Sequence, residues 1–271
     1  MKNVLSVAGS DSSGGAGIQA DVKTMCAFGV YGMTAITALT AQNTQSVLDV
    51  RETDAAMVAS QMRAVFLDIR VDAVKVGMVS NAHVAEAVRA GLVGFKARNI
   101  VVDPVMVSKS GCRLLRDDAV DALRALCAIA DVVTPNIGEA EVLSGFSIHN
   151  EDDMRRAAQT IAEGGAKAVL VKGGHLLAGD ATDVLFCAQG GGFSVLRAAR
   201  IATKNTHGTG CTLSSAIACR LALGDGTAEA VRAAKAYITR AIADGYALGG
   251  GHGPVGHLRE LYRRAGLEAA V

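Results

Sequence analysis

The chain of 271 residues contains no tryptophan, only three prolines and few aromatic side chains, which make up 4% of its residues. Its charge is nearly balanced, with 27 basic and 26 acidic residues. This balance gives no electrostatic case for nucleic acid or an anionic membrane as the main partner. The first residues, MKNVLSVAGSDSS, have too few apolar side chains for a signal peptide or a membrane span. We therefore expect a cytoplasmic protein that binds neither nucleic acid nor a membrane.

The six cysteines show no CxxC pair and no spacing with histidine that suits a metal ion. A disulfide framework or a zinc site is therefore not expected, and reduced thiols fit the cytosol. Half of the residues are hydrophobic, which is enough to form the core of one large α/β domain. No linker or internal repeat divides the sequence, so we expect a single domain over residues 1–271.

Short β-branched segments alternate with longer helical patterns along the chain. Strands are predicted at 3–9, 32–39, 72–79, 99–107, 131–136 and 167–174. Helices are predicted at 17–29, 54–68, 81–95, 117–127, 136–144 and 150–163, and two longer ones at 208–223 and 227–247. The segments at 181–187 and 193–198 favour an antiparallel hairpin at the sheet edge. This order predicts an α/β fold with a mostly parallel sheet and helices on both of its faces.

Ligands of such sheets bind beyond the carboxyl ends of the strands. The polar residues and glycines that follow the predicted strands should therefore meet in one crevice. They are residues 10–17, Gln42, Met78, Asp103, Asn136, 172–175 and 204–211.

The segment NTHGTGC at 205–211 opens one of the long helices. Gly208 and Gly210 would let the backbone turn tightly and expose N–H groups, and the helix dipole would add positive potential. The segment could instead be a simple loop before a packing helix. Its place at a strand end, with Thr206 and Thr209 beside the glycines, favours an anion-binding site.

Cys211 falls in the first turn of that helix, where the pKa of a thiol should lie below its usual value of about 8.5. A thiolate there could accept a proton from a substrate hydroxyl. Packing is the alternative, and we expect it for Cys219 two turns later. A third possibility is a cysteine nucleophile with His207 as its base.

Four further sites each admit two interpretations. Asp21, about one turn into the first helix, could reach the crevice or face solvent. Asp103 could hold magnesium through water, or it could cap a turn. Asn136 and Glu139 have the spacing of a capping box, and they could also contact magnesium and phosphate. Lys172 could contact a phosphate as a point charge, or it could be an ordinary surface residue.

Taken in order, seven motifs resemble those of the hydroxymethylpyrimidine/phosphomethylpyrimidine kinases of the ribokinase-like superfamily. The motifs are AGSDSSGGAGIQADVKT, TALTAQNTQSV, KVGMV, DPVMVSKSG, TPNIGEAEVL, VKGGH and KNTHGTGCTLSSAIA, and the similarity resumes near GHGPVGHL. The resemblance covers essentially the whole chain. It implies a three-layer ribokinase-like fold and a homodimer. It also implies an enzyme of thiamine diphosphate biosynthesis that uses ATP and Mg²⁺ to phosphorylate 4-amino-5-hydroxymethyl-2-methylpyrimidine, and then phosphorylates the monophosphate to the diphosphate.

The same resemblance implies a pyrimidine pocket. In it, Asp21 and Gln42 would hydrogen-bond the aminopyrimidine, while Met78 and Val105 would pack on its ring.

For the phosphate side, the resemblance implies that Gly208 and Gly210 form an anion hole and that the adenine lies toward the last helices. The residues that would serve the ATP phosphates and magnesium are Asn136, Glu139, Lys172, Thr209 and Asp103, the two carboxylates acting through water. Cys211 occupies the position where the wider superfamily usually has an aspartate base, since the loop here is Gly-Thr-Gly-Cys.

Two further functions stay open at this point. One is a vitamin B6 kinase of the same fold, whose substrates also carry a hydroxymethyl group on a flat heteroaromatic ring. The other is a non-catalytic pyrimidine- or nucleotide-binding protein. The glycine-bearing stretch at 108–114 is a candidate lid on its composition.

Overall fold

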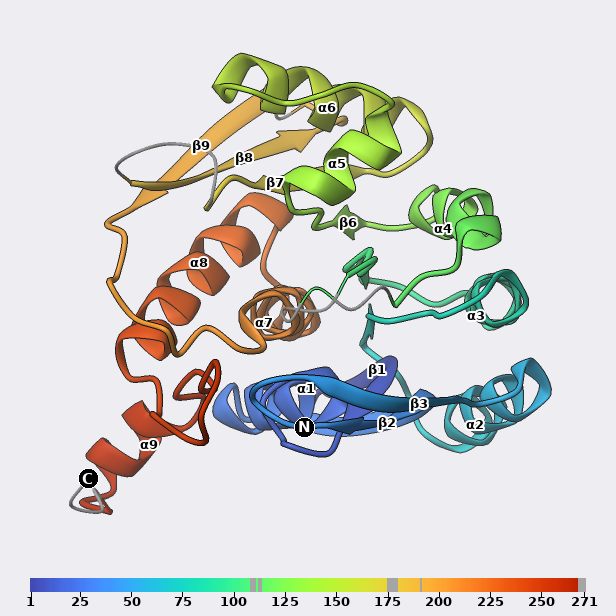
Figure 1. The fold of residues 1–271 in the computed structure, drawn as a ribbon. Helices are drawn as coiled ribbons and strands as arrows, with labels where there is room; N and C mark the ends of the chain where they lie inside the picture. Colours follow the sequence, from blue (N-terminus) through green and yellow to red (C-terminus); the bar gives the residue numbers. More distant parts are fainter. Residues whose placement is uncertain (108–110, 112–113, 175–179, 191, 268–271) are drawn as a thin grey trace.

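The computed structural model describes residues 1–107, 111, 114–174, 180–190 and 192–267 (Figure 1). Most of the predicted lid, residues 108–110 and 112–113, lies outside the described residues. Within those ranges no helix is both long enough and apolar enough to cross a membrane.

The strands of the described ranges form one nine-stranded sheet in the order β3-β2-β1-β4-β5-β6-β7-β8-β9. Their bounds are β1 (Asn3–Asp11), β2 (Tyr31–Gln42), β3 (Val47–Glu52), β4 (Ala73–Val76), β5 (Ile100–Val102), β6 (Val132–Val133), β7 (Ala168–Lys172), β8 (Ala181–Cys187) and β9 (Gly192–Ala198). The six strands from β2 through β7 in this order are parallel. β3 pairs antiparallel at one edge, and β8 and β9 form the predicted hairpin at the other.

Helices cover both faces of the sheet and complete the three layers (Figure 1). One face carries α1 (Gly17–Ala27), α7 (Thr209–Leu223) and α8 (Thr227–Ala243). The other carries α2 (Ala55–Asp68), α3 (Ala82–Gly94), α4 (Val120–Cys127), α5 (Ile137–Ser144) and α6 (Glu151–Glu163). A short helix, α9 (Arg259–Arg264), lies near the C-terminus. The two hydrophobic clusters between these layers confirm the expected α/β architecture.

The structure differs from the sequence prediction mainly at the edges and in strand length. The antiparallel strand β3 was not predicted, because only Val47 and Val50 of it are even partly buried and no apolar alternation marks it. No residue of α9 is buried, so it also lacks a periodic signal. In the middle of the sheet, β4, β5 and β6 are shorter than predicted, because the apolar residues that follow them belong to the loops at the strand ends.

β1 lies between β2 and β4, so the chain first extends the sheet on one side of β1 through β2 and β3 and then returns to its other side at β4. Crevices for ligands form at such a switch point, outside the carboxyl ends of the strands. Asp11 ends β1, Asp103 directly follows β5 and Lys172 ends β7. The loop before α7 reaches the same edge, because the His207 side chain contacts Asp11.

Candidate active site

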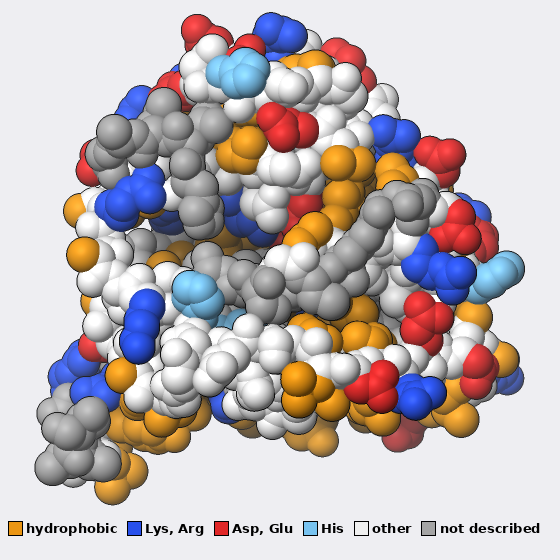
Figure 2. All heavy atoms as spheres, viewed as in Figure 1, with side chains coloured by type: hydrophobic (Ala, Val, Ile, Leu, Met, Phe, Trp, Pro, Cys, Tyr) orange, Lys and Arg blue, Asp and Glu red, His pale blue; other side chains and the backbone are white. Residues whose placement is uncertain are grey.

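A cavity of about 830 Å³ opens at this edge of the sheet. In Figure 2 basic side chains appear in a hollow below the part of the molecule that holds β8 and β9. The lining includes every predicted site residue except Asp21, namely Gln42, Met78, Asp103, Val105, Asn136, Glu139, Lys172, Gly208, Thr209, Gly210 and Cys211. Residues scattered over the sequence are thus brought to one cavity.

The centre of the cavity is an ion pair between Asp103 and Lys172. Lys172 Nζ lies 2.8 Å from Asp103 Oδ1, which also accepts a hydrogen bond from Thr134 Oγ1 at 3.1 Å. The backbone of Gly210 crosses directly over the pair, since a Cβ built there would lie 3.3 Å from Asp103 Oδ2 and 3.5 Å from Lys172 Nζ. A phosphoryl group beside Gly210 would therefore meet the lysine ammonium at short range.

Both members of this pair keep their charge. Burial alone would raise the pKa of Asp103, but Lys172 and Lys75 outweigh burial and hold that pKa below its usual range. Burial alone would lower the pKa of Lys172, but the Asp103 and Glu139 carboxylates outweigh it and raise the pKa. Lys172 is therefore a permanent, partly buried cation at the cavity and not a surface residue.

Asn136 and Glu139 form a capping box at the start of α5. Asn136 accepts a hydrogen bond from the Glu139 backbone N–H, and Glu139 Oε2 accepts one from the Asn136 backbone N–H at 2.8 Å. Both residues also line the cavity, so the capping role and a role at the site coexist. Burial raises the pKa of Glu139 to about 7, with Lys172 opposing the rise. Its carboxyl therefore titrates near neutral pH.

The described residues contain no group of three or more His, Cys, Asp or Glu side chains that could hold a metal ion. A cage made of protein ligands alone is not what Mg²⁺ needs, because it keeps several waters and takes further oxygens from substrate phosphates. Asp103 and Glu139 place two carboxylates at the same cavity wall, beside a lysine suited to phosphate. The residues therefore fit a magnesium ion shared with ATP.

The first turn of α7 faces the cavity with free backbone donors. Gly208 caps the helix at φ = 78°, and a Cβ there would lie 1.8 Å from the Gly15 carbonyl oxygen, so only glycine fits. Within the described part of the chain, no acceptor takes a hydrogen bond from the backbone N–H of Gly210 or Cys211. Such unsatisfied N–H groups at a helix N-terminus bind anions.

Cys211 lies in the first turn of α7, as predicted, but its predicted low pKa is wrong. Burial raises the pKa of the thiol to about 11. Lys75 and the backbone N–H of Gly17 act in the opposite direction without overcoming burial. The sequence prediction counted the helix N-terminus and missed the desolvation of the thiol.

Asp21 lies beneath the cavity and not on its wall, because its side chain is fully buried in an ion pair with Lys75. Lys75 Nζ contacts the two Asp21 oxygens at 2.9 and 2.8 Å. The hydroxyls of Ser6 and Ser215 donate to the same carboxylate at 2.6 and 2.7 Å. The Asp21 oxygens are thus occupied by protein donors from β1, β4 and α7.

His207 is not paired with Cys211 in the manner of a nucleophile and its base. His207 Nε2 lies 2.8 Å from Asp11 Oδ2 and 3.4 Å from Gln42 Nε2, and no hydrogen bond to Cys211 occurs in the described structure. The arrangement therefore gives no support to a Cys211–His207 dyad.

Several lining residues were missed from the sequence. Lys75 sits within a buried strand, where its neighbours suggested only core packing. Asp183 on β8 and Lys235 on α8 form an ion pair of 2.6 Å at the cavity, next to Ile238 and Thr239. No local motif marks Asp183, Lys235, Ile238 or Thr239, since only the folded sheet brings β8 and α8 together. They lie where the adenine was expected.

Three comparisons point to the same class of protein. A hydroxymethylpyrimidine/phosphomethylpyrimidine kinase of Rhizobium meliloti is 53% identical over 263 residues, which cover 96% of this chain and 98% of that protein. A bifunctional thiamine biosynthesis protein of Geobacter sulfurreducens is 52% identical over 257 residues, or 94% of this chain, and the chain spans about half (52%) of its length. The crystal structure of an ADP complex of Bacillus subtilis pyridoxal kinase matches with a TM-score of 0.88 and 39% identity, covering 95% of this chain and 98% of that one.

The three-layer fold, with free backbone N–H groups at a helix N-terminus over an Asp–Lys pair, is that of a kinase of the ribokinase-like class. The family model for phosphomethylpyrimidine kinase matches residues 11–256. This chain belongs to the phosphomethylpyrimidine kinase family.

Proposed function

We propose that this chain uses ATP to phosphorylate the 5-hydroxymethyl group of 4-amino-5-hydroxymethyl-2-methylpyrimidine, and then converts the monophosphate to the diphosphate for thiamine biosynthesis. The observation that carries this proposal is the cavity in which Asp103, Lys172 and the first turn of α7 meet Gln42 and Met78. One side of it suits phosphates and the other suits a flat polar ring.

In the proposed reaction the chain mainly holds charge and aligns the reactants. Lys172 and the free N–H groups of Gly210 and Cys211 would stabilise the negative charge on the transferred phosphoryl group. Mg²⁺, when bound with ATP, would neutralise phosphate charge, and Asp103 and Glu139 would hold it through water. Because phosphoryl transfer is largely dissociative, the proton of the substrate hydroxyl can leave late. The Cys211 sulfur would orient that hydroxyl as a weak hydrogen-bond acceptor, and the proton would pass to an oxygen of the transferred phosphoryl group.

At the other end of the cavity, Val105 and Met78 would pack on the pyrimidine ring and Gln42 would hydrogen-bond it. We assign Asp21 a supporting role, because its carboxylate is already bound by Lys75, Ser6 and Ser215. Thr209 and Asn136 would contact the ATP phosphates.

The test is to incubate the purified protein with ATP, magnesium and either the hydroxymethylpyrimidine or pyridoxal, and to count phosphates on each ring by mass spectrometry. We expect a monophosphate and then a diphosphate on the pyrimidine, with little product from pyridoxal. The 39% identity to a pyridoxal kinase makes pyridoxal the alternative substrate to test. A monophosphate formed chiefly on pyridoxal would replace the proposed substrate by a vitamin B6 compound.

A matched pair of lysine variants tests the role of the site in the same assay. Lys172→Met should lower kcat at least about a hundredfold, because it removes a charge that stabilises the transition state. Lys167→Met, on an exposed side chain just before the same strand, should leave kcat within about twofold. Equal activity of the two variants would exclude Lys172 from the reaction.

We also propose that the whole chain, residues 1–271, is one domain that works as a cytoplasmic homodimer. Tyr31, Leu39 and Leu48 on β2 and β3 are 54%, 54% and 73% exposed, and Figure 2 shows hydrophobic side chains along this margin. A second copy of the chain would cover them. Light scattering should give twice the monomer mass, and Leu48→Asp should shift the measured mass toward that of the monomer. If the chain is one domain, its thermal unfolding should show one transition. Cell fractionation would test the location.

A further inference from the structure

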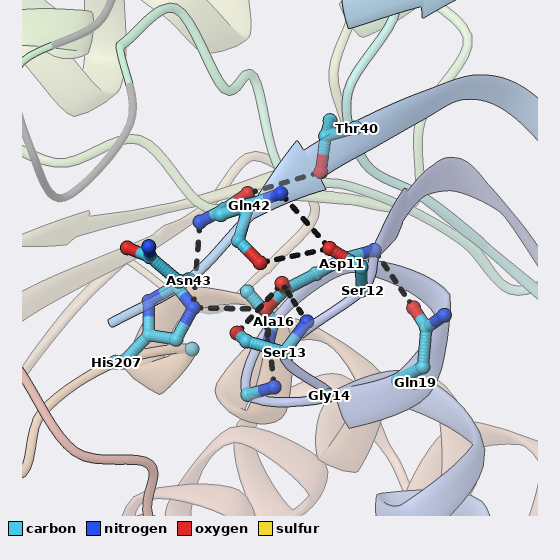
Figure 3. Close-up of polar contacts among 12 residues, drawn as sticks. Asp11, Ser12, Ser13, Gly14, Ala16, Gln19, Thr40, Gln42, Asn43 and His207 are labelled. Atoms are coloured by element: carbon cyan, nitrogen blue, oxygen red, sulfur yellow. Dashed lines mark hydrogen bonds and ion pairs between the residues drawn. The ribbon is translucent and has the colours of Figure 1, made fainter. Parts of the chain in front are cut away.

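Asp11 is a buried carboxylate that accepts hydrogen bonds from its own loop (Figure 3). Its Oδ1 accepts from the backbone N–H and the hydroxyl of Ser13 at 2.8 and 2.7 Å. Its Oδ2 accepts from the backbone N–H groups of Gly15 and Ala16 at 3.0 and 2.8 Å. Burial alone would raise the pKa of Asp11, but its hydrogen bonds with His207, Ser13 and Ala16 outweigh burial and lower it. Asp11 therefore stays an ionised acceptor.

This ionised acceptor decides which nitrogen of His207 carries a hydrogen. His207 Nε2 lies 2.8 Å from Asp11 Oδ2, so Nε2 must be the N–H donor of that hydrogen bond. The ring cannot easily turn away, because it lies against Gly15, where a Cβ would come within 2.3 Å of His207 Cδ2. Asp11 and Gly15 together hold a fixed N–H donor at this point.

The side-chain amide of Gln42 faces the His207 N–H donor with its own NH₂ group, so neither group has an acceptor in this contact (Figure 3). Gln42 Nε2 lies 3.4 Å from His207 Nε2, and two N–H groups cannot bond to each other. At its other end, Gln42 Oε1 lies 3.3 Å from Thr40 Oγ1, whose single hydrogen has a closer acceptor in the Ser10 carbonyl oxygen at 2.9 Å. A half-turn of the amide would exchange its two ends and pair both of them.

We propose that the Asp11–His207 pair sets substrate specificity by fixing this amide, with its oxygen toward His207 and its N–H group toward a ring nitrogen of a flat heteroaromatic substrate. In that orientation the His207 N–H donates to Gln42 Oε1. Thr40 Oγ1 then accepts from one hydrogen of Gln42 Nε2, and the other hydrogen is free for the ligand. The chain presents a donor at this point, so it selects rings with an acceptor there.

The rest of the Gln42 residue is held firmly enough for this orientation to matter. Its backbone N–H donates to Ser12 Oγ at 2.9 Å, and the Ser12 hydroxyl donates back to the Gln42 carbonyl oxygen at 2.8 Å. These two hydrogen bonds hold the Gln42 backbone in place at the end of β2. The contact between the Gln42 amide and the substrate ring rests on the proposed function. The hydrogen on His207 Nε2 does not, because it follows from the hydrogen bonds of Asp11.

The first test reads the His207 ring directly in the full-length protein. Protein labelled with ¹⁵N-histidine shows by NMR which ring nitrogen carries a hydrogen, and His207→Gln identifies the signal. We expect hydrogen on Nε2 both without ligand and with the hydroxymethylpyrimidine. A bare Nε2 would overturn the proposal. This measurement does not depend on turnover, so it decides the polarity even if the proposed function fails.

The second test uses kinetics on whichever ring the parent protein phosphorylates. Gln42→Glu keeps an acceptor and loses the donor, and Gln42→Met loses both. Each should raise the KM for the ring about tenfold with kcat within twofold, the size of one lost hydrogen bond. Near-parental KM in Gln42→Glu would show that the ring donates to Gln42 and would refute the proposal. Gln159→Glu, on an exposed glutamine of α6, is the matched control.

A further pair of variants separates the positioning role of His207 from packing. His207→Met removes the N–H and should raise the same KM several-fold, while leaving the KM for ATP unchanged. His207→Gln places an amide N–H within reach of Asp11 and should restore most of the loss. Failure of glutamine to do better than methionine would show that only the shape of the ring matters. His83→Met, on an exposed residue of α3, serves as the control.

Discussion

At Cys211, the helix N-terminus and the burial of the side chain act in opposite directions on the thiol. Burial dominates and raises its pKa to about 11, so only about 1 in 10⁴ of these thiols is ionised at pH 7. Cys211 is therefore a protonated thiol before the substrate binds. The sulfur lies between the N-terminus of α7 and the Gly17 backbone N–H at the start of α1, where it can orient a substrate hydroxyl as a weak hydrogen-bond acceptor.

Replacing this thiol should reduce activity more than replacing the cysteine two turns later. We expect Cys211→Ala to lower kcat up to about a hundredfold, because the variant loses the sulfur that orients the substrate hydroxyl. Cys219 packs in the core beneath α7, so Cys219→Ala should change kcat less than about twofold. Steady-state kinetics on the two purified variants would settle the comparison, and equal rates would remove Cys211 from the reaction.

The buried ion pair of Asp21 and Lys75 makes a prediction about stability. Asp21→Asn would leave the Lys75 ammonium without its charge partner, and breaking such a pair costs about 3–5 kcal/mol of unfolding free energy. The double variant Asp21→Leu with Lys75→Met removes both charges and should recover a large part of this loss. Urea denaturation measures both. A single variant as stable as the parent would mean that the pair carries little energy.

Glu139 predicts a pH dependence of stability. Because burial raises its pKa from 4.5 to about 7, the folded protein holds this proton more tightly than the unfolded chain between those values. The Glu139 contribution to stability is therefore present at low pH and is lost as pH rises through about 7. Glu139→Gln keeps the capping box without the titration. Relative to the parent, it should gain roughly 2 kcal/mol of unfolding free energy between pH 5 and pH 8.

Denaturation of the parent and of Glu139→Gln at the two pH values measures this gain. Glu163→Gln, on an exposed side chain at the end of α6, is the control and should show a much smaller change. A difference between Glu139→Gln and the parent that stays constant with pH would contradict the prediction.

At the scale of elements, the sequence predicts most of the strands and helices because their apolar periodicity is local. It also predicts which strand ends carry the site, since parallel strands share one carboxyl edge. What it misses depends on contacts between distant segments. β3 exists through its pairing with β2, and Lys75 reaches the cavity lining only because β4 lies beside β1, where its side chain contacts Asp21 of α1. The high pKa of Cys211 likewise arises from packing that no local pattern encodes.

The loop before α7 and the loop after β1 pack so closely that a methyl group should separate them. At Gly208 the left-handed backbone, with φ = 78°, costs a non-glycine residue about 1–2 kcal/mol, and the new Cβ would also clash with the Gly15 carbonyl oxygen. We expect Gly208→Ala to lose at least about 2 kcal/mol of stability and to lower kcat/KM more than tenfold.

Calorimetry and steady-state kinetics would test this prediction for the two loops. Gly94→Ala, in α3 with no atom near the added methyl group, should leave both quantities nearly unchanged. Normal kinetics in Gly208→Ala would show that the loops can separate without harm.

For the molecule as a whole, the arrangement places charged groups along one edge of a sheet whose interior is mostly apolar. Asp103, Lys172 and Lys75 are all largely buried, and each is neutralised by a partner from a different element. A permanent opposite charge lets each stay ionised at low exposure. The charged side chains of the cavity are therefore oriented before a substrate binds. Little reorganisation would be needed when a phosphate enters.

The pairing of Asp11 with His207 has a consequence for how the protein is made. Asp11 and His207 are 196 positions apart, and Asp21 and Ser215 are 194 positions apart. Each of these carboxylates near the N-terminus therefore forms a hydrogen bond with a residue from the last quarter of the chain. A ribosome that has translated through β7 has produced most of the sheet but neither the first turn of α7 nor His207. The protein should thus bind its ligands only after His207 and the first turn of α7 have been synthesised. A product terminated before this segment should bind neither ATP nor the pyrimidine.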